Sequence, residues 1–185
     1  RFRIASDGSL STTTAGTSNV RFGVNAGNSI TSGGNYNVAV GDEAGTAINT
    51  GDENTVVGYK AGEAVTTGVR NTLIGATAGD EIVGGERNTA VGYGALHSET
   101  EGDRNTAVGV FALSTQNTST GGNVYNTGVG YGAGNAITIG VRNVIVGAQA
   151  LDAETAGSRS VAVGYAALSA QNFTTATDVY NTAVG

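Results

Sequence analysis

Residues able to carry out chemistry are few and scattered in this chain. The single histidine, His97, has no partner of metal-ligand or catalytic type repeating at a fixed spacing around it. There is no cysteine, which excludes disulfides and thiolate metal sites. No GxSxG, HExxH or phosphate-binding loop occurs either. We therefore expect no enzyme, no catalytic residues, no metal and no other cofactor.

Aromatic side chains, in contrast, recur regularly. From the third copy on, tyrosine follows the glycine of a repeated motif in every second copy, at Tyr59, Tyr93, Tyr131 and Tyr165. If successive copies stack as parallel strands, the rings lie about 9–10 Å apart. Such a strip is a candidate contact surface for a glycan or another surface. The alternative is packing, with each ring filling a gap between coils or chains.

The charged residues indicate a surface exposed to water, and acidic residues outnumber basic ones in the chain. Arginine precedes five of the motifs, with acidic neighbours, and each exposed pair is worth only about 0–1 kcal/mol. A net charge of −6 argues against nucleic acid and anionic membranes, both of which require a basic face. No apolar run approaches the roughly 18 residues of a membrane helix, so we expect no membrane insertion.

An internal repeat predicts the strands and turns that position these residues. Copies related to "NTAVG" begin at Asn19, Asn37, Asn54, Asn71, Asn88, Asn105, Asn126, Asn143, Ser160 and Asn181. Most are 17 residues apart, and the ten copies cover 19–185. We number each copy from this residue as position 1 and call the copies coils 1–10. Residues 1–18 are expected to form a strand-and-turn connector, and 19–185 a repeat domain whose last coil is truncated.

Each coil is predicted to contain a strand, a bend, a short second segment and a turn. Positions 2 and 4 are mostly β-branched, and position 5 is Gly in all ten copies. Seventeen residues rich in Gly and β-branched side chains cannot hold a helical hairpin. We therefore predict an all-β fold, a parallel β-solenoid of about ten stacked coils. The recurring Asn at position 1 is interpreted as a ladder that satisfies backbone groups in the turns.

The faces of the strand decide which residues form the core. Positions 2 and 4 share one face, and position 3 points the other way. We predict that position 4 forms a buried core ladder of Val40, Val57, Ile74, Val91, Val108, Val129, Val146 and Val163. Position 3 is also mostly small or aliphatic, and a strand that is apolar on both faces is expected to be covered on both. The thin coil and this second face together predict a homotrimer.

A correlation between positions 9 and 12 points to one shared core slot. Where position 9 is Gly, position 12 is Ile or Val, and where position 9 is Leu, position 12 is Glu or Gln. The rule holds in all nine complete coils. Filling the slot twice would overpack the core, and leaving it empty would open a cavity.

Coils 6 and 9 each carry four extra residues after position 9. A solenoid accommodates such residues only where they loop outward, so 114–124 and 169–179 are expected to bulge from the same edge. Surface loops on a rigid scaffold often carry binding residues. Asn117, Asn172 and Phe173 are therefore further candidates for surface contact, although simple spacer loops explain the same sequence.

The motifs "NVAVG", "NTVVG", "NTLIG", "NTAVG" and "SVAVG", each followed by Ala at position 8, resemble head repeats of trimeric autotransporter adhesins. The longer "NTAVGYGAL" resembles repeats in bacteriophage tail fibres, and "RFRIASDGSL" a segment found near them. The resemblance covers about nine-tenths of the chain. It implies a left-handed β-roll that trimerises.

Three functions remain open on the sequence. The first is a structural segment of a virion or other extracellular fibre for host or surface attachment, with a cell-surface glycan or protein receptor as partner. The second is the head domain of a bacterial adhesin at the cell surface. The third is ice binding by ranked threonines, which recur at position 2 on the face assigned to the core. The missing initiator Met and the truncated last coil suggest a segment of something longer.

Overall fold

The computed structural model describes residues 2–4, 10–12 and 15–185. Two short strands open the chain, β1 (Phe2–Ile4) and β2 (Leu10–Thr12), and they pair antiparallel. The expected connector thus contains two strands, while the residues between them lie outside the described part. No helix occurs among the described residues.

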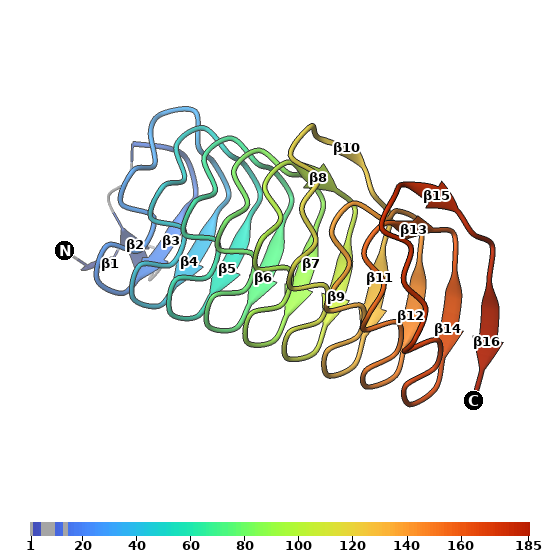
Figure 1. The fold of residues 1–185 in the computed structure, drawn as a ribbon. Helices are drawn as coiled ribbons and strands as arrows, with labels where there is room; N and C mark the ends of the chain where they lie inside the picture. The colour runs from blue at the N-terminus through green and yellow to red at the C-terminus, as the bar shows by residue number, and fades with distance from the viewer. Residues whose placement is uncertain (1, 5–9, 13–14) are drawn as a thin grey trace.

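Ten three-residue strands form one sheet that runs the length of the molecule (Figure 1). All neighbours are parallel and in register, so that Val57 pairs with Ile74 and Ile74 with Val91. The predicted parallel solenoid of stacked coils is confirmed. The strands are β3 (Val20–Phe22), β4 (Val38–Val40), β5 (Thr55–Val57), β6 (Thr72–Ile74), β7 (Thr89–Val91), β9 (Thr106–Val108), β11 (Thr127–Val129), β12 (Val144–Val146), β14 (Val161–Val163) and β16 (Thr182–Val184).

Four two-residue strands lie in the turns that lead into strands of the long sheet, where the long coils rejoin the stack. β10 (Gly122–Asn123) pairs with β8 (Gly102–Asp103), and β15 (Thr177–Asp178) pairs with β13 (Gly157–Ser158). Both pairs are parallel. Each long coil therefore returns to the register of the coil before it.

The bend after each strand explains the invariant glycine at position 5. Gly58 has a φ of 136°, and a Cβ added there would lie 2.6 Å from the carbonyl of Gly75 in the next coil. Backbone meets backbone at this column, which leaves no room for a side chain. Only Gly satisfies both the conformation and the close approach.

The core lies on the strand face opposite to the one predicted. Position 3 is fully buried in coils 2–9, for example at Val56, Leu73 and Ile145, and it packs with the alanines of position 8. The predicted core ladder forms an in-register column, but its side chains point outward and are half-buried or exposed. This corrects the assignment of Val40, Val57, Ile74, Val91, Val108, Val129, Val146 and Val163 to the core.

The physical reason is the narrow interior of the coil. Opposite the strand, position 8 and the side chain at position 9 or 12 already occupy most of the space. Gly128 at position 3 shows how tight it is, because an added Cβ would lie 2.9 Å from the Leu113 side chain. Position 3, which is often Ala or Gly, fits this interior, whereas a continuous column of Val and Ile fits the outside.

Distances support the shared core slot. Ile48 and Ile82 at position 12 and Leu96 at position 9 are all fully buried, and the Glu or Gln at position 12 of the coils with a buried leucine is buried as well. A Cβ added to Gly45 would lie 2.6 Å from Cδ1 of Ile48, so the two positions compete for one space. Leucine at position 9 adopts a φ near +50°, as at Leu96 (52°), and burial of its side chain offsets the cost of this conformation.

Candidate binding surfaces

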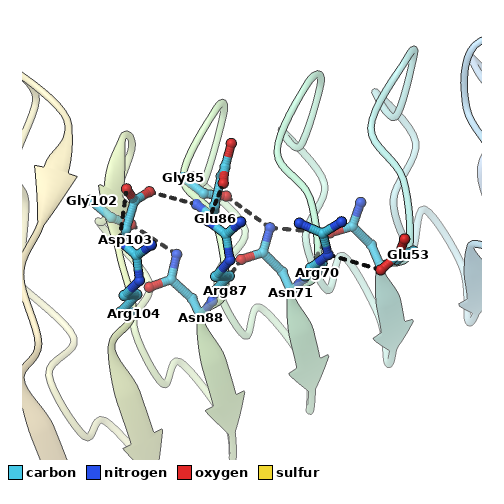
Figure 2. Close-up of polar contacts among 11 residues, drawn as sticks. Glu53, Arg70, Asn71, Gly85, Glu86, Arg87, Asn88, Gly102, Asp103 and Arg104 are labelled. Carbon is cyan, nitrogen blue, oxygen red and sulfur yellow. Dashed lines mark hydrogen bonds and ion pairs between the residues drawn. The ribbon is translucent and has the colours of Figure 1, made fainter.

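The asparagines of position 1 form a buried ladder and are not available for recognition within the stack. The Oδ1 atom of Asn54 accepts the backbone N–H of Asn71 at 3.0 Å. The Nδ2 atom of Asn71 donates to the carbonyl of Gly85 at 2.8 Å, an arrangement that Asn88 repeats with Gly102 (Figure 2). Oδ1 of each of these asparagines thus bonds the next coil, while Nδ2 bonds a turn carbonyl of its own coil, in agreement with the predicted ladder.

Arginine and acidic side chains form the exposed ladder beside it (Figure 2). Nε of Arg70 lies 2.9 Å from Glu53 in the preceding coil, and Arg87 contacts its neighbour Glu86. The backbone N–H of Glu86 donates to Asp103 at 2.8 Å. Half-exposed pairs of this kind contribute about 0–1 kcal/mol each, so the ladder favours solubility more than it favours binding.

The two long loops bulge from the same edge of the molecule, as predicted, above the labels β10 and β15 in Figure 1. A buried carboxylate fixes the base of the first loop. Oε1 of Glu99 accepts N–H groups of Thr100, Gly102 and Thr118 at 2.8–3.0 Å. Thr118 belongs to the loop itself, so Glu99 connects coil 5 to the extra residues of coil 6.

Glu154 does the same for the second loop. Its Oε1 atom accepts the N–H groups of 155–157 and of Phe173, and its Oε2 atom accepts from Gln171 at 2.9 Å. The functional reading of the sequence missed both glutamates. The signal was present, because glutamate occupies position 12 only in the coil before each long one.

The loop residues singled out from the sequence lie at these two bases and not at the loop tips. Asn117 accepts the hydroxyl of Thr100 at 3.1 Å, and Asn172 accepts that of Thr155 at the same distance. Phe173 bonds Glu154 through its N–H and leaves its side chain 37% exposed. The asparagines therefore anchor the loops, while Phe173 remains available for contact.

A hollow of about 400 Å³ opens beside the first loop. Its walls are loop residues 117–124, Ile139 and Val141 from the next coil, and Ala176 from the second loop. One cost of the loop is visible beneath it. Among the described residues, Nδ2 of the buried Asn105 has no hydrogen-bond partner, whereas Nδ2 of Asn88 in the preceding coil bonds the carbonyl of Gly102.

The tyrosine strip is exposed and lies at the edge that follows the strands. Tyr59, Tyr93, Tyr131 and Tyr165 expose between 52% and 74% of their surface. None of them lines the hollow beside the first long loop, so the candidate contact residues form two groups. Two further tyrosines directly precede position 1 after the long loops, Tyr125 and Tyr180, and both are exposed and lie beside Arg104 and Arg159.

His97 has a partner one coil away that the sequence reading missed. Its Nδ1 atom contacts the carboxylate of Asp80, which occupies the same position 10 in the preceding coil. Burial raises the pKa of Asp80, and the contact with His97 partly opposes that shift. A search for partners exactly one period distant would have found this pair.

Comparisons with protein-family models, curated proteins and solved structures find no match.

Within residues 2–4, 10–12 and 15–185, no helix is long and apolar enough to cross a bilayer. The same residues contain no group of three or more His, Cys, Asp or Glu side chains able to hold a metal ion.

Proposed function

We propose that the chain is a rigid structural segment of a multimeric extracellular or virion fibre that serves attachment to a host or surface. The observation that carries this proposal is the outward strand face. Positions 2 and 4 of ten parallel strands present only Val, Ile, Phe and Thr side chains. Ile74, Val108 and Val146 in this face are 36–38% exposed.

An apolar sheet face of this length favours association with a second surface of the same kind. Parallel sheets in proteins are normally covered on both faces, and large exposed apolar patches mark interaction sites. Every coil repeats the same pattern in register, so copies of the chain can associate along the whole rod. We propose a homotrimer, with the strand faces of three chains turned toward a common axis.

Sedimentation equilibrium of the chain tests this proposal. A trimer has about three times the chain mass of 18.3 kDa at all concentrations above its dissociation constant. A folded species of 18.3 kDa at high concentration would contradict it. A head domain of a bacterial trimeric adhesin predicts the same mass, and the flanking segments of the full gene distinguish it from a virion fibre.

One observation favours a second candidate function, ice binding. The threonines of position 2 point outward and not into the core, so Thr55, Thr72 and Thr89 form a regular, half-exposed row beside the valines. A flat array of hydroxyl and methyl groups at the strand spacing can order water. This function requires an open face, and thermal hysteresis in freezing solutions tests it. A trimer without hysteresis excludes it.

A further inference from the structure

A second hollow, of about 130 Å³, lies on the tyrosine edge between coils 6 and 8. Its lining residues come from three successive coils and combine aromatic, amide and carboxylate groups. They are Phe111, Tyr131, Gly132, Asn135, Gln149 and Asp152. This composition differs from the rest of the edge and from the loop hollow, which is lined by small polar and aliphatic residues.

The hollow exists because Gly132 interrupts a column of side chains. Position 7 carries Phe111 in the coil before and Gln149 in the coil after. A Cβ added to Gly132 would meet no atom within 4 Å, so the space above it is open. Phe111 is held in place on the other side, because its ring packs edge-on against Tyr93 with centroids 5.2 Å apart.

The polar groups around this space supply both donors and acceptors. Asn135 accepts the hydroxyl of Ser114 through Oδ1, which leaves its Nδ2 as a donor. Gln149 likewise accepts the hydroxyl of Tyr165 through Oε1, at 3.2 Å, and retains its amide hydrogens. Asp152 adds a carboxylate acceptor. Among the residues that the structure describes, no lysine or arginine lines the hollow.

We propose that this hollow binds one pyranose ring of a neutral glycan. A sugar ring offers an apolar C–H face that packs on an aromatic ring such as Tyr131, which is 58% exposed. Its neighbouring hydroxyl groups both donate and accept, which matches a carboxylate beside two amides. The absence of a cation from the lining and the net charge of −6 disfavour acidic sugars.

The size of the hollow fits a single ring. Pockets for drug-sized ligands are usually about 300–1,000 Å³, and this one is smaller. Weak binding by one hollow is multiplied when several chains present it together. The inference therefore rests on the proposed attachment function and names its ligand class.

The test uses ligand-observed NMR with the methyl glycosides of glucose, galactose, mannose and N-acetylglucosamine as probes. We expect saturation transfer from the chain to at least one of them. The blocking variant is Gly132→Asn, because asparagine tolerates the φ of 60° at this residue and its side chain enters the open space. We expect it to weaken binding by about tenfold or more.

The matched control is Thr77→Asn, at the same position 7 with a φ of 51° but two coils before Phe111. It places the same side chain on the same column and should leave binding unchanged. Tyr131→Phe should retain binding and Tyr131→Ser should lose it, because the ring face is the contact. Circular dichroism of each variant confirms that the solenoid is intact.

Three results would overturn the proposal. They are no transfer to any of the four glycosides, equal binding by Gly132→Asn and the unmodified chain, and preferential binding of glucosamine or glucuronate, which are charged sugars. Sedimentation of the same samples separates this inference from the proposed function. A trimer that binds no sugar contradicts only the glycan site, whereas a monomer that binds sugar contradicts only the assembly.

Discussion

At the scale of single residues, stability depends on how the narrow interior is filled. Leu73 lies between two glycines of position 9, and a Cβ added to Gly62 or Gly79 would lie 2.8 Å from its methyl groups. Gly79 also faces Ile82, whose Cδ1 would be 2.9 Å from the same Cβ. Each side chain in this core is thus matched to its neighbours in the coil and in the stack.

Gly79→Leu tests the shared slot, because it adds a second large side chain where Ile82 already lies. Overpacking of this kind costs about 1–3 kcal/mol of unfolding free energy. Adding Ile82→Ala to the same chain should restore part of the loss, since the contact with Ile82 is then relieved while the contact with Leu73 remains. Urea denaturation measures both. A double variant no more stable than the single one contradicts the shared slot.

The buried glutamates make a different contribution, through hydrogen bonds to the loop bases. Glu154→Gln keeps the size of the side chain but removes the charge that accepts four N–H groups. It also turns an amide toward the donor Nε2 of Gln171. We expect a loss of about 1–3 kcal/mol.

Glu81→Gln is the control for this variant. Its side chain is 52% exposed, and surface substitutions usually change stability by less than about 0.5 kcal/mol. Chemical denaturation of the two variants in parallel gives the comparison. Equal stabilities would mean that the buried carboxylate does not hold the second loop.

At the scale of elements, the coil is a regular unit and the two loops are additions to it. The first loop leaves Nδ2 of Asn105 buried and unpaired, whereas Nδ2 of Asn88 bonds the carbonyl of Gly102. The loop therefore costs the coil one hydrogen bond that all regular coils between Asn37 and Asn88 make.

Deleting 119–122, with Asn123→Gly, returns coil 6 to seventeen residues and places a glycine carbonyl within reach of Asn105. We expect the solenoid to remain folded and to be equally stable or more stable, by up to about 1 kcal/mol. Thermal unfolding followed by circular dichroism checks this. If the shortened chain fails to fold, the extra residues belong to the core and do not form an added loop.

The elements show how far the sequence alone could reach. The spacing of the asparagines predicted parallel strands in register, and the alternation at positions 9 and 12 predicted the core slot. The inward face was assigned wrongly, because positions 3 and 4 are both apolar and alternation alone does not choose between them. The feature that indicates burial of position 3 is the variation in the size of its side chain, from Gly128 to Leu73. In a packed core, a larger side chain at one position is accommodated by smaller side chains around it.

The candidate site was predictable only in part, for a related reason. The regular spacing of the tyrosines in the sequence predicted the strip that they form at the surface. The hollow beside Tyr131 depends on a missing side chain at Gly132 and on residues from two neighbouring coils. Such contacts follow from stacking, so they appear in a sequence only when positions one coil apart are compared.

At the scale of the whole molecule, the outward strand face decides the proposed assembly. Val108 lies in the middle of this face and is 36% exposed. Val108→Lys places a charge there, and burying it between chains would be strongly unfavourable. We expect this variant to sediment as a folded monomer or to need a much higher concentration to assemble.

Val83→Lys is the matched control, because Val83 is also 36% exposed but lies outside the strands, at position 13. It should sediment as the unmodified chain does. If both variants assemble normally, the strand face is not the interface.

Thiol labelling of two adjacent single-cysteine variants tests the central claim most directly, and the natural chain contains no cysteine to interfere. Val56→Cys lies on the inward face and Val57→Cys on the outward face of the same strand. In the native assembly we predict slow maleimide labelling of both variants. When Val108→Lys is added to separate the chains, Val57→Cys should label rapidly and Val56→Cys should stay protected. Rapid labelling of Val57→Cys in the unmodified native background would show that the face is open to water and would contradict the assembly.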